Sequence, residues 1–205
     1  MFTLTKEYDK RLKECLEYLY LKTGEDDIGS KKYAENAVEY MNSKGKEELK
    51  KDIDVCILKG GSYKIKGYYL ENNTLKDIRG ASVLLTHVEE TVVPDVIKSD
   101  FNESCIIYCG GGNIFALVPG NTDENYALKL EETAQKYLIS ANIAYCISRP
   151  IKLSLLLGKE YKRIISENES ELNERKKLKI IDSIGVQSPV FLFIESSHVP
   201  SYAHF

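Results

Sequence analysis

The part of this sequence best suited to approach a ligand closely is residues 110–113, which read GGGN. They separate two apolar, β-branched and aromatic runs, residues 105–109 and 114–118, and this pattern predicts a β-hairpin whose tip adopts positive φ angles. Bare backbone at such a tip lets N–H groups come close to a phosphate. A structural hairpin needs only one or two glycines, and a third weakens the strand end through backbone entropy. The composition therefore favours a ligand-approach loop over a plain turn by a small margin.

The cysteines and histidines form no metal-binding or catalytic pattern. The five cysteines are odd in number, have no C-x-x-C spacing and fall mostly in predicted strands or on an apolar helix face. Two of them lie four residues apart on one predicted strand face, but no histidine is near enough in sequence to complete a zinc site. We predict buried, hydrophobic cysteines and no zinc. The residues concerned are Cys15, Cys56, Cys105, Cys109 and Cys146, with the histidines scattered at His87, His198 and His204.

The overall composition is that of a soluble globular protein. The chain has 205 residues, a formal net charge of -3 and a pI near 5.8. This balance argues against binding nucleic acid through the whole surface. The apolar stretches are shorter than a membrane span, and the charged N-terminus lacks the apolar core of a signal peptide. We expect a cytoplasmic protein with one principal domain.

Hydrophobic periodicity predicts the elements that would position the GGGN tip. Apolar residues at helical spacing predict two amphipathic helices within residues 1–52. The apolar run 53–58 predicts a first strand that stops at Gly60 and Gly61, as a central strand leading into a functional loop would. A short helical or irregular piece follows, and then a longer helix that starts near residues 79–82 and ends before Pro94.

The elements after the hairpin complete a recognisable order. Residues 121–140 predict a helix with Thr122 or Asp123 as its N-cap, and residues 141–149 predict a strand. Strand, helix, strand, strand, helix, strand is the ferredoxin-like order, so we predict an α+β fold with two helices on one face of an antiparallel four-stranded sheet. The expected divisions are an N-terminal helical segment (1–52), the ferredoxin-like domain (53–150) and a C-terminal helical segment with a tail (151–205).

The C-terminal segment contains the one dense basic run of the chain. Residues 159–182 form a highly charged helical stretch that keeps a helical period only in part, and an apolar segment follows at 189–195. Cations at the end of a helix complement its dipole, so we favour a solvated helix end over an RNA contact. The run consists of Arg175, Lys176, Lys177 and Lys179.

Two segments, residues 60–82 (GGSYKIKGYYLENNTLKDIRGAS) and 106–120 (IIYCGGGNIFALVPG), together with the predicted order of elements, resemble a known family. The resemblance is to the palm domain of the large polymerase/cyclase-like subunit of type III CRISPR effector complexes, and within that group to the second-palm type. It covers about residues 53–149. The resemblance implies a ferredoxin-like palm in an antiviral defence particle, with other effector subunits and a guide RNA as partners through the complex.

Active palms of this kind carry metal-binding carboxylates that this chain lacks. In them, an acidic residue at the end of the first strand and an acidic pair at the hairpin tip hold divalent metals that activate a ribose 3′ hydroxyl. The matching positions here are residues 58–61, which include no carboxylate, and the GGGN tip, where Asn113 offers only a neutral oxygen. We therefore expect a catalytically degenerate palm that binds no metal and requires no cofactor.

A nucleotide such as ATP is still a candidate ligand of this degenerate palm. Backbone N–H groups of the glycines would hold it, with Lys64 or Arg79 facing phosphate. Arg79 also has a salt bridge as an alternative role, and for Ser82 we favour an N-cap at the start of the long helix. The candidate nucleotide-binding residues are Gly60, Gly61, Lys64, Arg79, Ser82, Gly110, Gly111, Gly112 and Asn113.

Alternatives to a non-catalytic effector component stay open at this point. One is an active nucleotide cyclase or oligonucleotide synthetase in which a partner, such as a second palm in a dimer, completes the metal site. Another is a ferredoxin-like regulatory domain that binds a small ligand. Where related subunits carry a zinc-binding C-x-x-C-G element, this chain has Ile181, Ile184 and Gly185, which implies loss of that zinc. With no HD nuclease motif and no second palm, we expect either a split piece of a larger subunit or a reduced stand-alone relative.

Overall fold

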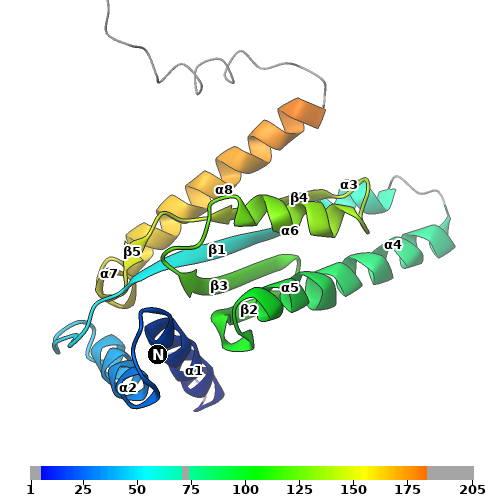
Figure 1. The fold of residues 1–205 in the computed structure, drawn as a ribbon. Helices are drawn as coiled ribbons and strands as arrows, with labels where there is room; N and C mark the ends of the chain where they lie inside the picture. Colours follow the sequence, from blue (N-terminus) through cyan, green and yellow to red (C-terminus); the bar gives the residue numbers. More distant parts are fainter. Residues whose placement is uncertain (1–5, 71–73, 184–205) are drawn as a thin grey trace, which may run out of the picture.

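The fold is built on one antiparallel sheet, in which four strands lie in the order β2-β3-β1-β4 (Figure 1). In this computed structural model residues 6–70 and 74–183 are described. The strands are β1 (Asp54–Tyr63), β2 (Ile106–Gly110), β3 (Asn113–Pro119) and β4 (Asn142–Ile147), and a two-residue strand β5 (Ile151–Lys152) pairs with the start of β1. With helices between β1 and β2 and between β3 and β4, this is the ferredoxin-like order, and the predicted α+β fold is confirmed.

The helices fall before, between and after these strands. Two precede the sheet, and two follow it beyond the predicted boundary at residue 150. The helices of the described residues are α1 (Lys6–Lys22), α2 (Asp27–Asn42), α3 (Ile65–Leu70), α4 (Leu75–His87), the π-helix η1 (Val88–Val92), α5 (Val93–Asp100), the 3₁₀ helix η2 (Glu103–Cys105), α6 (Tyr126–Gln135), α7 (Leu153–Leu157) and α8 (Tyr161–Ser183).

Strand β1 has an uninterrupted apolar run because helices cover both of its faces. Successive side chains of a strand point to opposite faces. Cys56 and Leu58 accordingly pack with α4, α5 and α6, whereas Val55 and Ile57 pack with α1, α2 and α7 on the other side. The run that predicted a central strand therefore reflects burial on two faces.

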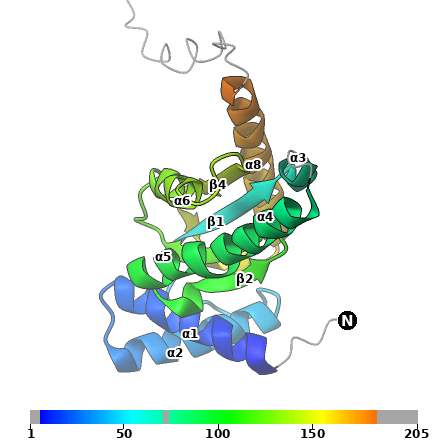
Figure 2. The same cartoon turned by 90° about the vertical axis from the view of Figure 1, so that its right-hand side faces the viewer.

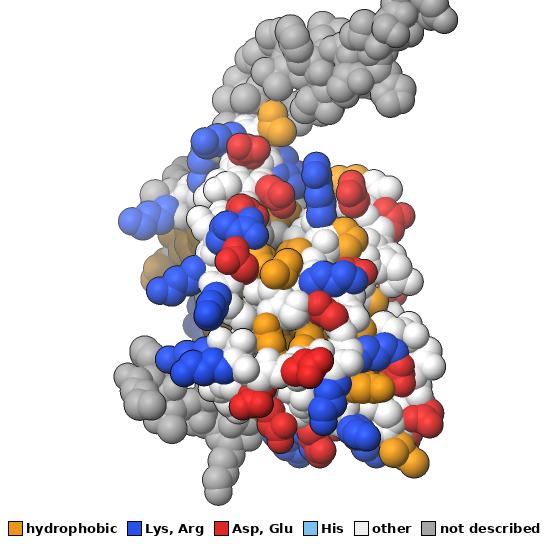
Figure 3. Space-filling model, turned by 90° about the vertical axis from the view of Figure 1, so that its left-hand side faces the viewer, with side chains coloured by type: hydrophobic (Ala, Val, Ile, Leu, Met, Phe, Trp, Pro, Cys, Tyr) orange, Lys and Arg blue, Asp and Glu red, His pale blue; other side chains and the backbone are white. Residues whose placement is uncertain are grey.

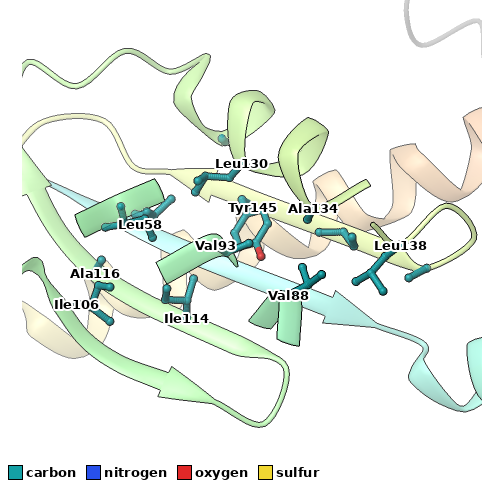
Figure 4. Close-up of a cluster of buried hydrophobic side chains, with 14 of the residues drawn as sticks. Leu58, Val88, Val93, Ile106, Ile114, Ala116, Leu130, Ala134, Leu138 and Tyr145 are labelled. Atoms are coloured by element: carbon teal, nitrogen blue, oxygen red, sulfur yellow. The ribbon is translucent and has the colours of Figure 1, made fainter. Parts of the chain in front are cut away.

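The core on the first face fills the space between the sheet and the helices of the two crossovers (Figure 4). Leu58 of β1 and Ala116 of β3 have no exposed surface, and Leu130 of α6 is likewise fully buried against them. Val88 and Val93 approach from the π-helix and α5. The helices of the two crossovers therefore pack side by side on one face of the sheet, as the order of elements predicts.

The second face is covered by the terminal helices. In Figures 1 and 2, α1 and α2 lie together at the bottom of the molecule and α8 rises at the top. Leu16 and Leu19 of α1 pack under β1 and β3, and Leu172 of α8 packs against Ala144 and Cys146 of β4. The N-terminal and C-terminal segments thus share the face that the crossover helices leave open.

The segment 74–100 is one long helix that passes through Pro94, contrary to our expectation that it ends before that residue. Its start is also earlier than predicted, because Thr74 is the N-cap and accepts a hydrogen bond from the Asp77 N–H. Before Pro94 the helix widens into a π turn, in which the Val93 N–H bonds to the Val88 carbonyl. Pro94 follows this π turn directly, and the widened turn is where the continuous helix accommodates a residue that lacks an N–H.

The strand β4 forms one edge of the sheet, and side chains from two helices occupy its outward hydrogen-bonding groups. The Tyr145 N–H donates to Glu131 Oε1 of α6 at 2.8 Å, and Lys179 Nζ of α8 donates to the Ile143 carbonyl at 3.1 Å. An exposed edge is a template for pairing with another chain. Here the edge is covered by specific polar contacts.

On the surface, charges of both signs are interspersed. Figure 3 shows the end of the molecule that carries α2, α7 and β5, where acidic, basic and apolar side chains alternate. Within the described residues no helix combines the length and apolar character that crossing a membrane requires. The apolar segment 189–195, Ile184 and Gly185 lie outside the described residues.

Candidate functional site

The structure brings the two glycine-rich segments of the sequence together. Gly60 lies opposite Ile114 in the β1–β3 register, and Gly110 pairs with Asn113 to close the predicted hairpin. The tip continues this register alongside β1, and the carbonyl of Gly112 lies directly against Gly61. Segments about fifty residues apart in the chain therefore form one feature, which we call the glycine junction: Gly60, Gly61, Gly110, Gly111, Gly112 and Asn113.

Gly60 and Gly61 lie inside β1, not in a loop after it. The strand continues to Tyr63, and both glycines are buried and paired with β4. Their φ angles are +156° and +148°, which side-chain-bearing residues rarely adopt. A Cβ on Gly60 would overlap Ala144 and Tyr145, and a Cβ on Gly61 would overlap Gly112. Close packing of three strands therefore explains why both positions are glycine, and our expectation that the strand stops there is wrong.

The tip itself is a two-residue turn. Gly111 and Gly112 have φ angles of +58° and +80°, as the central residues of a type I′ hairpin turn require. Gly111 is exposed and Gly112 is buried. Asn113 is exposed, and its Nδ2 donates to the Gly111 carbonyl at 3.2 Å. The asparagine side chain thus stabilises the turn, while the exposed backbone at Gly111 is open to solvent.

The remaining predicted residues lie on the segments that follow β1. Lys64 joins β1 to α3, with φ +54° and an exposed side chain. Arg79 is exposed on α4, and it forms no ion pair with any residue whose side chain the structure describes, 10–69 and 74–179. Ser82 lies in the middle of α4, so the N-cap role that we favoured for it is wrong. Figure 1 places α3 and the start of α4 beyond the end of β1.

A carboxylate that the sequence pattern did not indicate lies beside the glycine junction. Glu89 belongs to the π-helix η1, and its Oε1 is buried without a hydrogen-bond partner. A Cβ built on Gly112 would lie 3.4 Å from that oxygen, so the tip covers it directly. In sequence it is one half of a Glu89–Glu90 pair inside an apolar helix. An acidic pair in a helix predicts two exposed side chains, so nothing in the sequence signals that a carboxylate oxygen of Glu89 is buried.

Burial raises the pKa of Glu89 above the usual glutamate value. The Ser62 hydroxyl and the Gly112 N–H face the carboxylate and act in the opposite direction, and the neighbouring charge of Glu90 raises the pKa further. The glycine junction therefore holds one carboxylate, which is poorly compensated. Among the described residues no three histidine, cysteine, aspartate or glutamate side chains gather closely enough to hold a metal ion.

The basic run near the end of α8 is neither a purely solvated helix end nor an open cationic patch. Arg175 forms a bidentate pair with Glu131, both bonds being 3.0 Å, and Lys179 lies 2.7 Å from the same carboxylate. The side chain of Glu131 is 2% exposed. Lys177 is exposed, and the Lys176 ammonium lies 5.7 Å from the centre of the Tyr63 ring. Half of the run therefore connects α8 to α6.

The buried cysteines agree with the sequence analysis. Cys15, Cys56, Cys105 and Cys146 are buried, Cys109 is half-buried, and all five are free thiols. Burial raises the pKa of Cys56 and of Cys146 to about 11, so both stay protonated at neutral pH.

Comparison of the chain with models of known families, with curated proteins and with solved structures found no match.

Proposed function

We propose that this chain is a catalytically degenerate palm-domain component of a type III CRISPR effector complex, acting in the cytoplasm. Its role is structural, through contacts with neighbouring subunits and, by way of the complex, with guide RNA. ATP or another nucleotide is its candidate small ligand, approaching the exposed part of the glycine junction at Gly111 with Lys64 or Arg79 near the phosphates.

The observation that carries the proposal is the meeting of β1 with the hairpin tip in a sheet of order β2-β3-β1-β4. The resemblance places the metal-binding carboxylates of active palms at these two positions. Here residues 58–61 and the GGGN tip include no carboxylate, and Glu89 reaches the tip from a different element. Two divalent cations beside a triphosphate need several anionic oxygens, so a single carboxylate supports a non-catalytic role.

A nucleotide cyclase or oligonucleotide synthetase completed by a partner is the second candidate, and Glu89 is the observation in its favour. Its free oxygen supplies one of the ligands that a cation would need. A second palm or another subunit would then have to supply the others.

The test of the proposal is isolation of the tagged protein from its own host at moderate salt, with identification of the attached RNA and polypeptides. We expect short guide-like RNA and several co-purifying subunits. A monomer or dimer without RNA would contradict an effector role and would direct attention to a stand-alone nucleotide-binding domain.

Incubation of the purified chain with ATP or GTP and magnesium or manganese separates the two candidates. We expect no cyclic or linear oligonucleotide product. Product formed by the wild type and by Glu90→Gln, but lost in Glu89→Gln, would establish the second candidate, a nucleotide cyclase or oligonucleotide synthetase. The Glu90→Gln variant is the matched control because Glu90 is exposed and adjacent in the same π-helix.

A further inference from the structure

A groove of about 560 Å³ lies between the start of β1, the loop after β4, β5, α7 and the first half of α8. None of its lining residues belongs to the glycine junction, so it is independent of the function proposed above. Pro150, Ile151, Leu155 and Ile164 give it an apolar wall. Its volume is in the range of small-molecule sites, which are largely apolar with a few polar groups that orient the ligand.

A buried amide without a full set of partners lines this groove. Asn168 of α8 is 2% exposed, and its Nδ2 donates to Cys146 Sγ at 3.6 Å, while its Oδ1 is buried and has no partner. Turning the amide by 180° would only exchange which of the two atoms is unpaired. Leaving a buried polar atom without a partner is unfavourable, and a ligand group that reaches it and donates to it removes that cost.

One cation of the groove is also unpaired. Lys152 pairs with Asp54 at 3.0 Å, and Arg163 pairs with Glu167 at 2.6 Å. Arg149 is exposed and forms neither a hydrogen bond through its guanidinium nor an ion pair with any side chain that the structure describes, in residues 10–69 and 74–179. A free guanidinium at the mouth of a groove is suited to bind a carboxylate or phosphate in a bidentate manner.

The charge that balances Arg149 in the groove is Glu171. This carboxylate forms no hydrogen bond or ion pair with the side chains that the structure describes. Its pKa is raised, chiefly by burial, while the nearby charge of Arg149 acts to lower it. Once the Lys152 and Arg163 pairs are set aside, the groove presents one guanidinium and one carboxylate, and the buried amide of Asn168 lies in its wall. A nucleoside phosphate would bring at least one uncompensated negative charge toward this carboxylate. A ligand with one charge of each sign is balanced.

We propose that this groove binds a small zwitterion of the amino-acid class, a free apolar α-amino acid or a dipeptide. Its carboxylate pairs with Arg149, its ammonium donates to Asn168 Oδ1 and Glu171, and its side chain packs on Pro150 and Leu155. The chain would then have a second ligand-binding site, on the side of the sheet that α8 covers.

The test is titration calorimetry of the full chain with L-leucine and L-leucyl-L-leucine, with leucinamide, 4-methylpentanoate and AMP as comparison ligands. We expect saturable binding of leucine or its dipeptide. Leucinamide, which lacks the carboxylate, and 4-methylpentanoate, which lacks the amine, should each bind at least about tenfold more weakly, because each loses a charge-assisted hydrogen bond.

Two exposed arginines of the groove give a matched pair of variants. Arg149→Ala should weaken binding of the zwitterion by about tenfold or more, whereas Arg163→Ala should leave it within about twofold, because Arg163 already pairs with Glu160 and Glu167. Circular dichroism should show both variants folded, since both side chains are exposed. The proposal is overturned if neither leucine nor its dipeptide binds, if Arg149→Ala binds as the wild type does, or if AMP binds in their place.

Discussion

Two glutamates place buried carboxylate oxygens against the same sheet, and their surroundings are opposite. Glu131 lies at the edge strand β4, where three donors satisfy it: Arg175, Lys179 and the Tyr145 N–H. Glu89 lies under the hairpin tip, where Oε1 has no partner. Burial acts to raise the pKa of both carboxyl groups. At Glu131 the hydrogen bonds outweigh burial and lower the pKa, whereas at Glu89 burial prevails.

The difference separates a structural carboxylate from one whose presence the fold does not require. A buried charge with complete hydrogen bonding stabilises the arrangement around it, and an uncompensated one weakens it. Glu131 holds three elements together, because α6, α8 and β4 all meet at its side chain. Among the described residues Glu89 faces only the Ser62 hydroxyl and the Gly112 N–H, and its Oε1 has no partner. Perturbed carboxyl groups of this kind gather at functional sites, so Glu89 is a candidate for a functional role.

The largest effect that we predict is at Gly61, whose packing against Gly112 keeps the tip over Glu89. Gly61→Ala combines a φ angle of +148° with overlap of the new Cβ and the Gly112 carbonyl. We expect the free energy of unfolding to fall by about 4 kcal/mol, measured by urea denaturation. The tip should also move away from Glu89, which would let water reach the carboxylate and lower its pKa.

The matched control is Gly80→Ala on α4, where an added Cβ has no neighbour within 4 Å. Because alanine favours the helix, this change should stabilise the protein by about 0.5–1 kcal/mol. Equal effects of the two substitutions would show that the glycine junction is not closely packed.

The second prediction is the loss of Glu131. Glu131→Ala leaves the buried Tyr145 N–H unpaired and removes the partner of Arg175 and Lys179. Both cations are partly exposed and can turn to solvent, so we expect a cost of about 3 kcal/mol in the free energy of unfolding. Glu132→Ala, at the adjacent exposed position, should change it by less than about 0.5 kcal/mol.

The pH dependence of that loss follows from the lowered pKa. In the unfolded chain Glu131 titrates near the ordinary value of about 4.3, and in the folded chain it titrates lower. Its stabilisation is therefore present above that value and is lost as the pH falls through the folded pKa. The difference between wild type and Glu131→Ala should shrink in acid, and a constant difference down to about pH 2 would contradict the pairing.

Much of the fold could be predicted from residue patterns, because its elements have strong local signals. The apolar run of β1, the glycine turn between β2 and β3, and the helix and strand patterns after it together predict the order of elements. Patterns failed where tertiary contacts override them. Gly60 and Gly61 resemble a strand end, yet they lie inside β1 because three strands pack there. Asn125 is the N-cap of α6 in place of Thr122 or Asp123, which instead hydrogen-bond to nearby backbone.

The site was harder to predict because its polar contacts join distant parts of the chain. Arg175 and Glu131 are 44 residues apart, so the basic run gave no sign that it pairs with α6. Glu89 could not be foreseen because charged residues in a helix are ordinarily exposed, and the hairpin tip that covers its Oε1 lies more than twenty residues away in sequence. The spacing of residues within one segment does not indicate which distant segment its polar side chains will contact.

The smallest effect, and the one that tests the comparison most directly, is at Glu89. Its folded pKa is raised, so its contribution to stability is fully present below the unfolded value of about 4.3 and is lost as the pH rises through the folded pKa. Glu89→Gln has no such charge. At about pH 7 the variant should be more stable than the wild type by about 1 kcal/mol, and at about pH 4 the two should be nearly equal.

Glu90→Gln is the control, because Glu90 is exposed, and it should change the free energy of unfolding by less than about 0.5 kcal/mol at either pH. Urea denaturation of the three proteins at both pH values measures all of these differences. If Glu89→Gln destabilised the protein at neutral pH, the ionised carboxylate would be a structural partner of Ser62 and Gly112, and the two glutamates would no longer differ in kind. If it stabilised the protein, the chain would be retaining a carboxylate at the glycine junction at the expense of its own stability.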